Sequence, residues 1–180
     1  MAWVEKAFEE SMTPHIDEIY HKRFSKLDTI KRSDRTAEAD SKILFMDKEL
    51  AIDTFLYFTD GTVLTLQEKT RRNFYLGKYG DIFTFEYYND PHTKDEGEWF
   101  KLAAQLYFYG FANEEQTGYT KYWLIDVPVL RSTLKNDVGI ETLEKKYLRQ
   151  NKPPAKANFF AIPFEIINPK CILRSGQATA

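Results

Sequence analysis

The residues best suited to chemistry are an aspartate and a Gln-Glu-Lys triplet in two neighbouring segments of β-forming residues. Asp53 lies in the first segment, and Gln67, Glu68 and Lys69 lie near the end of the second. A buried charge in such apolar segments is costly unless it is paired or binds a metal. Gln67 and Lys69 are two positions apart, so we expect both on the same strand face. A cross-strand ion pair between Asp53 and Lys69 is the simpler interpretation, and a metal site is the alternative.

A short turn connects the two segments. Residues 50–58 and 62–70 are both rich in β-forming residues, and Asp60-Gly61 lies between them. Two such runs joined by Asp-Gly are typical of a β-hairpin. The hairpin is therefore the element that must bring Asp53 and the triplet together.

The length of this turn decides which residue faces Asp53. A two-residue turn sets Asp53 opposite Glu68 and turns Gln67 and Lys69 to the other face. A three-residue loop, with Gly61 left-handed at its third position, sets Asp53 opposite Gln67. Asp-Gly suits both turns. Because the proposed chemistry requires Asp53, Gln67 and Lys69 to converge, we predict the three-residue loop or an equivalent bulge further along the strands.

The other elements follow from apolar periodicity and from turn residues. We predict a helix over 3–24 with a kink or break at Thr13-Pro14, a loop or poorly paired strand over 25–42, a long connection over 73–97 that includes short strands, helices over 98–111 and 138–150, and strands over 119–127 and 158–167. Pro163 favours an edge position for the last strand. The polar tail after Leu173 is expected to be frayed.

This order predicts a mixed α/β protein with a mixed central β-sheet flanked by helices. It lacks the regular alternation of a doubly wound fold. The length is that of one domain, so we predict a single domain over 1–180, with a core over about 1–127, an extension over about 128–173 and a tail over 174–180.

Asp53 followed fourteen positions later by Gln67-Glu68-Lys69 resembles the PD-(D/E)xK nuclease superfamily. The element order of helix, three strands, helix and strand is similar to the restriction-endonuclease-like core of that superfamily. The resemblance implies that Asp53 and the first triplet residue hold a divalent metal, while Lys69 helps to orient and activate the attacking water. No proline precedes Asp53, and Gln67 stands where the pattern has an acid, as in Gln-x-Lys variants similar to the Mrr-like branch.

The resemblance implies Mg²⁺ or Mn²⁺ as the cofactor. Its ligands would be Asp53, the side-chain oxygen of Gln67 and the backbone carbonyl of Glu68. Such oxygen ligands suit Mg²⁺, which supports phosphodiester hydrolysis by activating water and neutralising phosphate charge. Because one carboxylate is a small counter-charge for a divalent cation, a further acid is expected from Glu9, Glu10, Glu49 or Glu68. Gln105 and Tyr109 resemble the Gln-x-x-x-Tyr element of RecB-like nucleases and would share one helical face.

Basic residues form three local clusters. Arg71 and Arg72 leave the hairpin beside the proposed metal site, so we predict that they contact DNA phosphates. The other two clusters are predicted to be solvated surfaces, with DNA phosphate contacts as the alternative. They are Lys31, Arg32 and Arg35, and Lys145, Lys146, Arg149 and Lys152.

The composition excludes several classes of protein. With 43% hydrophobic residues and 25 basic against 27 acidic side chains, the chain is neither disordered nor globally basic. The single cysteine, Cys171, cannot form an internal disulfide, which predicts a reducing, cytoplasmic location. No apolar run approaches the ~20 residues that cross a bilayer, so no membrane association is expected. The scattered histidines do not suggest zinc, and no P-loop is present.

The sequence therefore predicts a Mg²⁺-dependent deoxyribonuclease, an intracellular hydrolase that acts on DNA. One alternative is an inactive nuclease-fold protein that binds nucleic acid or a protein. Another is a structural or interaction domain in which Asp53 and Lys69 only form an ion pair. The oligomeric state is left open, with a homodimer among the alternatives.

Overall fold

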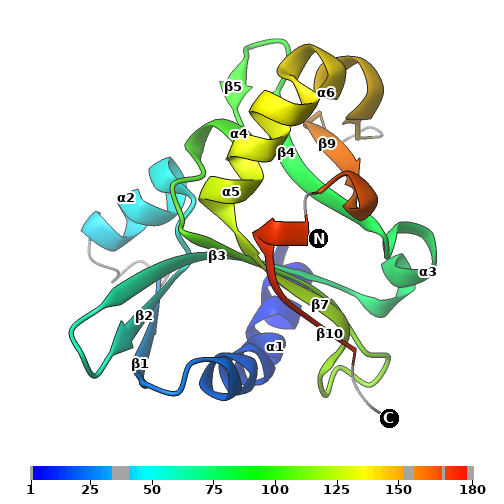
Figure 1. The fold of residues 1–180 in the computed structure, drawn as a ribbon. Helices are drawn as coiled ribbons and strands as arrows, with labels where there is room; N and C mark the ends of the chain where they lie inside the picture. Colours follow the sequence, from blue (N-terminus) through cyan, green and yellow to red (C-terminus); the bar gives the residue numbers. More distant parts are fainter. Residues whose placement is uncertain (1, 34–40, 152–155, 168, 178–180) are drawn as a thin grey trace.

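The central element is a six-stranded mixed β-sheet (Figure 1). The computed structural model describes residues 2–33, 41–151, 156–167 and 169–177. The sheet order is β1-β2-β3-β6-β7-β10, with strands β1 (Leu27–Arg32), β2 (Thr54–Phe58), β3 (Val63–Arg71), β6 (Leu106–Ala112), β7 (Tyr119–Asp126) and β10 (Ile172–Gln177). The β3–β6 pair is parallel, whereas β1–β2, β2–β3, β6–β7 and β7–β10 are antiparallel. The predicted mixed central sheet is confirmed.

A second sheet and several helices complete the fold. The second sheet has the order β5-β4-β9-β8, formed by β4 (Ile82–Asp90), β5 (Asp95–Glu96), β8 (Leu148–Gln150) and β9 (Asn158–Pro163). The helices are α1 (Ala2–Arg23), α2 (Ser41–Leu50), α3 (Leu76–Tyr79), α4 (Glu98–Lys101), α5 (Val127–Ser132) and α6 (Ile140–Tyr147), with a π-helical segment at Thr133–Val138. Within the described ranges, no helix is long and apolar enough to span a membrane.

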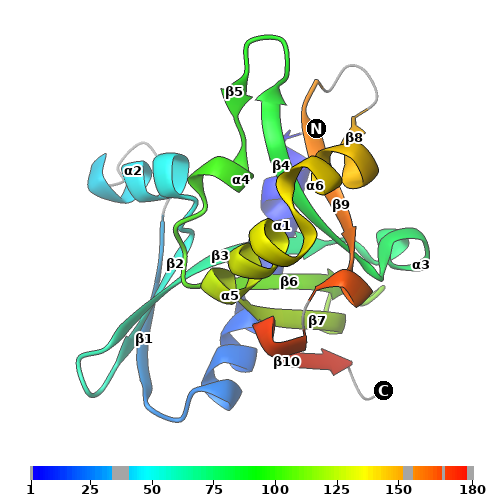
Figure 2. The ribbon, with the colours of Figure 1, turned by 45° about the horizontal axis from the view of Figure 1, so that its top comes forward.

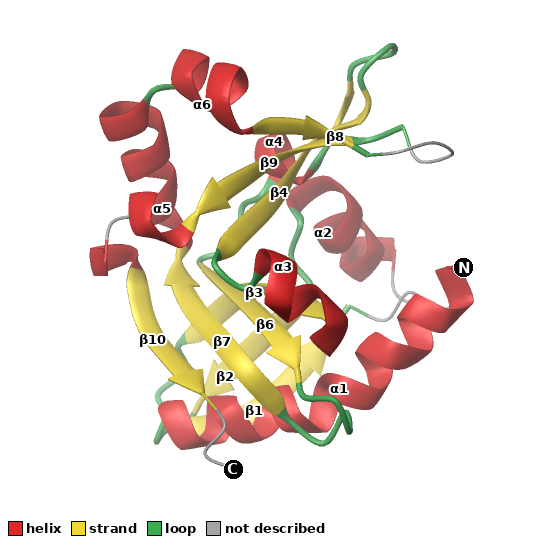
Figure 3. Ribbon diagram, turned by 90° about the vertical axis from the view of Figure 1, so that its right-hand side faces the viewer, coloured by secondary structure: helices red, strands yellow, loops and turns green. Residues whose placement is uncertain are grey.

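Each face of the central sheet carries its own core. On one face, α1 buries Phe8, Met12, Ile16 and Tyr20 against strand residues that include Leu66. The spacing of four places these α1 residues on one helical face. The other face packs against the second sheet, α4, α5 and the segment that follows it. Figures 2 and 3 show α1 on one side of the sheet and α5, α6, β4 and β9 on the other.

The hairpin has the predicted three-residue loop. The Phe58 N–H donates to the Thr62 carbonyl at 2.9 Å, and Gly61 has a φ of 83°. Thr54 pairs with Leu66 and Phe55 with Thr65, so the paired residue numbers add up to 120 along β2 and β3. The paired register ends at Thr54, and the Asp53 N–H donates to the Leu66 carbonyl at 2.8 Å, so Asp53 is not part of the register and its position opposite Gln67 stays a prediction.

Gly61→Ala is expected to lower the free energy of unfolding by about 1 kcal/mol, because an L side chain at this φ is strained. Gly77→Ala is the matched control, since Gly77 has no such φ and a Cβ at either position meets no atom within 4 Å. Urea unfolding measures both variants. Equal stabilities would contradict the left-handed loop.

The predicted helix over 98–111 is wrong. Only Glu98–Lys101 is helical, and Leu106–Ala112 is the central strand β6. All seven β6 residues are buried because both faces of the sheet are covered. A strand buried on both faces shows a continuous apolar run instead of alternation, and such a run also matches a helix.

Several other predictions need correction. The helix at the start of the chain is one element with Pro14 inside it, not two short helices. The predicted connection over 73–97 contains the nine-residue β4. The strand with Pro163 lies between β4 and β8 in the sheet order, but β8 pairs only with residues 158–160, so at Pro163 itself β9 is paired with β4 alone among the described strands. The tail is not frayed up to Gln177, because β10 pairs with β7.

The remaining predicted elements agree in part. The strand over 119–127 is confirmed as β7, and the helix over 138–150 is shorter and ends in β8. Within 25–42, β1 forms the paired edge strand, while residues 34–40 lie outside the described residues. Arg35 and Lys152 of the basic clusters also lie outside them.

Candidate active site

A cavity of about 680 Å³ lies at the edge of the central sheet, where β1 and β2 stop and β3 continues. Arg32 pairs with Thr54, and Thr54 pairs with Leu66, but β3 extends five residues further, to Arg71. The last part of β3 therefore has β6 on one side and open space on the other. This space is lined by charged and polar side chains that include Glu9, Glu10, Asp53, Gln67, Lys69 and Glu98.

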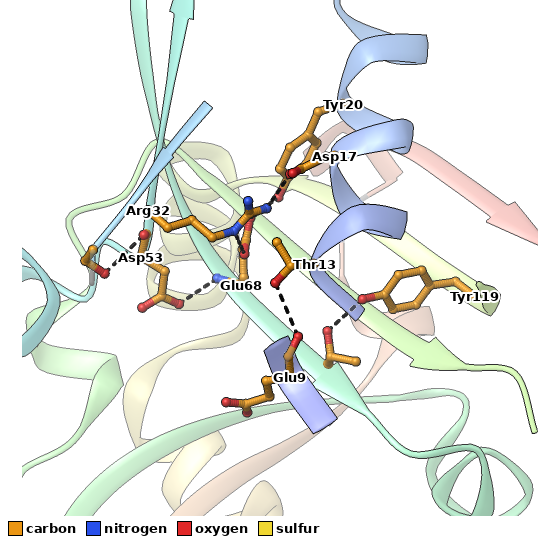
Figure 4. Close-up of polar contacts among 10 residues, drawn as sticks. Glu9, Thr13, Asp17, Tyr20, Arg32, Asp53, Glu68 and Tyr119 are labelled. Atoms are coloured by element: carbon orange, nitrogen blue, oxygen red, sulfur yellow. Dashed lines mark hydrogen bonds and ion pairs between the residues drawn. The ribbon is translucent and has the colours of Figure 1, made fainter. Parts of the chain in front are cut away.

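Asp53 is fixed at this opening by its backbone and its side chain. Its N–H donates to the Leu66 carbonyl at 2.8 Å, and its carbonyl accepts from the Ser33 N–H at 2.7 Å. Its Oδ2 accepts from the Glu68 N–H at 2.9 Å. The carboxylate thus lies level with the β3 backbone, as Figure 4 shows. Ala51, with a φ of 46°, turns the chain from α2 into this position.

Gln67 and Lys69 line the same cavity from β3. The Gln67 Oε1 atom is buried and has no hydrogen-bond partner among the described residues. Lys69 Nζ lies 3.2 Å from Glu98 Oε2 and 3.9 Å from Glu86 Oε1. Lys69 therefore forms its ion pairs with the crossover between β3 and β6, and not with Asp53.

Glu98 is a nearly buried carboxylate that sequence reasoning missed. Its side chain is 8% exposed and accepts a hydrogen bond from the Tyr107 hydroxyl. Burial and the adjacent Glu98 carboxylate raise the pKa of Tyr107 well above its ordinary value, so the hydroxyl remains a donor. Glu98, at the start of α4, therefore positions the Lys69 ammonium in the cavity through this ion pair.

The side chain of Glu68 points to the α1 face of the sheet. Its carboxylate accepts from Arg32 Nε at 3.1 Å and from the Tyr20 hydroxyl at 3.0 Å. Arg32 Nη2 also donates to Asp17 at 2.6 Å (Figure 4). Burial acts to lower the pKa of Arg32, but Glu68 and Asp17 outweigh it, so the pKa of the guanidinium is raised. Glu68 is therefore the centre of an ionic network that supports β3 from behind the cavity.

The backbone of Glu68 is placed differently from its side chain. Its N–H points toward Asp53. The N–H and C=O of one residue leave an extended strand on the same side, so the Glu68 carbonyl is directed to the side of Asp53 as well. The predicted backbone ligand is thus on the open edge of β3.

The other predicted acids divide into two groups. Glu9 and Glu10, which are exposed on α1, line the cavity. Glu49, on α2, is not among its lining residues. Within the described ranges, no three His, Cys, Asp or Glu side chains gather closely enough to hold a metal ion.

Gln105 and Tyr109 do not form the predicted pair on a helix. Gln105 precedes β6, and its Oε1 accepts from the Thr65 N–H at 3.0 Å. Tyr109 is buried within β6, and its hydroxyl lies 3.2 Å from Thr84 Oγ1. The two residues belong to a loop and a strand because the predicted helix is absent from this region.

Arg71 and Arg72 point to opposite faces of β3. Arg71 donates to Thr84 Oγ1 at 2.8 Å, on the face of the second sheet. The Arg72 guanidinium lies 4.1 Å from the centroid of the Phe8 ring on α1. The adjacent arginines therefore do not form one basic patch beside Asp53.

The oxygen donors at this cavity fit a hard divalent cation. The Gln67 oxygen, which has no hydrogen-bond partner among the described residues, and the Asp53 carboxylate line the same cavity, and Mg²⁺ and Mn²⁺ prefer such oxygen ligands. The charge of Lys69 is balanced by Glu98, so Lys69 does not cancel the charge of Asp53. Nothing matches the chain among protein-family models, curated proteins or solved structures.

Proposed function

We propose that the chain is a Mg²⁺- or Mn²⁺-dependent deoxyribonuclease with a restriction-endonuclease-like core. The observation that carries the proposal is the buried Gln67 oxygen, which has no hydrogen-bond partner among the described residues; Gln67 lines the same cavity as Asp53 and shares the strand face of Lys69. The open edge of β3 and the parallel β3–β6 pair support the same core.

The residues of the chain would divide the chemistry as follows. Asp53, Gln67 and the Glu68 carbonyl would hold the cation, which supplies charge neutralisation and an activated water when bound. The Glu68 N–H orients the Asp53 carboxylate. Lys69 would contact the attacking water or the phosphate oxygens. Glu98 would hold the Lys69 ammonium in place.

Cleavage is expected on at least one form of DNA in the presence of Mg²⁺ or Mn²⁺, and excess EDTA should reduce it to background. The measurement is gel analysis of supercoiled, linear and single-stranded DNA incubated with the purified chain. Cleavage that persists in EDTA would contradict the metal-dependent mechanism. Binding of DNA without cleavage under any of these conditions would favour an inactive nucleic-acid-binding protein.

A further inference from the structure

A second cavity, of about 610 Å³, lies between the central sheet and the second sheet. Its size is within the range of roughly 300–1,000 Å³ that is usual for small-molecule sites. The residues of interest on its walls are Arg71, Tyr75, Tyr79, Tyr147, Arg149 and Phe159. The cavity thus combines cations with aromatic rings.

Arg71 is the central charge of this cavity. Its Nη2 donates to Thr84 Oγ1 at 2.8 Å, and its guanidinium lies 6.0 Å from the centroid of the Tyr75 ring. Among the residues that the structure describes, no carboxylate lies within ion-pair distance of Arg71. Glu98 acts on Arg71 only through longer-range electrostatic attraction. A partly buried guanidinium with no ion-pair partner among the described residues is suited to an incoming anion, because Arg binds phosphate through several donors at once.

The aromatic walls suit a planar ligand. Tyr75 and Tyr79 come from the segment that follows β3, Tyr147 ends α6, and Phe159 belongs to β9. Tyr75 is 37% exposed, which leaves its ring accessible from solvent. Nucleic-acid bases stack on such rings with little dependence on sequence.

The two cavities are adjacent along β3. Lys69 and Glu86 line both of them. Gln67, Lys69 and Arg71 share one face of β3, and successive members of this row are about 6.6 Å apart. This distance is close to the spacing of successive phosphates in an extended single strand of DNA. A DNA strand with one phosphate at Lys69 could therefore place its next phosphate at Arg71.

We infer that the second cavity binds one unstacked nucleotide of the substrate strand, with its phosphate on Arg71 and its base against the tyrosines. The inference rests on the proposed function, because it names the part of the substrate that lies next to the cleavage site. It also assigns Arg71 and Arg72 different roles, although they are neighbours in the sequence.

The test is binding of thymidine 5′-monophosphate, thymidine and inorganic phosphate to the full chain in EDTA, measured by ligand-observed NMR. Thymidine 5′-monophosphate should bind more tightly than either fragment. Arg71→Gln should weaken its binding by about 10- to 100-fold, as expected for lost hydrogen bonds to a charged group. Tyr75→Leu should also weaken it. Arg72→Gln is the matched control and should leave it unchanged.

Four results would overturn the inference. If thymidine bound as tightly as thymidine 5′-monophosphate, the phosphate would not contact Arg71. If inorganic phosphate bound as tightly as thymidine 5′-monophosphate, the cavity would bind anions without recognising the base. Equal weakening by Arg72→Gln would indicate non-specific attraction. The Asp53→Asn variant separates the two proposals, since it should lose cleavage and keep nucleotide binding. Nucleotide binding without any cleavage by the unaltered chain would refute the nuclease, and cleavage without nucleotide binding would refute this inference.

Discussion

Asp53→Asn is expected to reduce metal-dependent DNA cleavage by about a thousandfold, because it removes the charged ligand of a cation whose contribution is several kcal/mol. The asparagine oxygen can still accept from the Glu68 N–H, so the hairpin should remain folded. Cleavage rates at saturating Mg²⁺, together with urea unfolding, measure the two effects separately. Asp60→Asn is the control, since Asp60 is an exposed aspartate in the turn of the same hairpin.

Two companion variants sharpen this result. Gln67→Leu removes the unpartnered oxygen and should also lose activity, whereas Gln67→Glu restores an acid at this position and should keep or raise the affinity for Mg²⁺. If Asp53→Asn retained full activity, the nuclease proposal would be wrong. If Gln67→Leu retained full activity and Asp53→Asn did not, the second metal ligand would be a residue other than Gln67.

Glu68→Ala is expected to lower the free energy of unfolding by about 2–3 kcal/mol. This is less than the roughly 3–5 kcal/mol for one partner of a fully buried pair, because Arg32 keeps Asp17 and some solvent contact. The Arg32 side chain is 25% exposed and that of Glu68 is 12% exposed. The loss should also leave the Tyr20 hydroxyl without its acceptor. Burial is the largest cause of the raised pKa of Tyr20 and it persists in the variant, so the hydroxyl cannot ionise instead.

The control for Glu68→Ala is Glu18→Ala. Glu18 pairs with Lys22 on the exposed side of α1, where an ion pair contributes little to stability. Urea unfolding of both variants gives the comparison. Because Glu68→Ala keeps the backbone N–H and carbonyl of this residue, the folded variant should still cleave DNA. A stable but inactive Glu68→Ala would mean that the carboxylate, and not the backbone, serves the active site.

The hairpin was predictable because its signals are local. Asp60-Gly61 indicates the turn, and the period of two places Gln67 and Lys69 on one face. Asp-Gly suits loops of two or three residues, so the three-residue loop, in which Gly61 has a positive φ, follows only from the requirement that the site residues converge. β6 was not predictable in the same way. Leu102, Leu106 and Tyr109 have helical spacing by coincidence, because a strand buried on both faces has no alternation to identify it.

The contacts that complete the site could not be derived from the sequence. Lys69 and Glu98 are 29 positions apart, and Arg32 and Glu68 are 36 positions apart. The first pair depends on how the crossover between β3 and β6 packs against β3, and the second depends on how the edge strand β1 packs near β3. A short sequence motif contains no information about contacts between residues so far apart in the chain. The sequence predicted which β3 residues share a face, but not which charges would balance them.

The two sheets depend on residues that are synthesised late. β9 and β10 come after position 157, and each joins a different sheet. Tyr88 of β4 pairs with Asn158, which lies 70 positions downstream. At about 5–20 residues per second, a ribosome needs roughly 4–14 s to supply that partner. During this interval the apolar residues Phe83 and Phe85, which are fully buried in the finished fold, lack the cover that β9 provides.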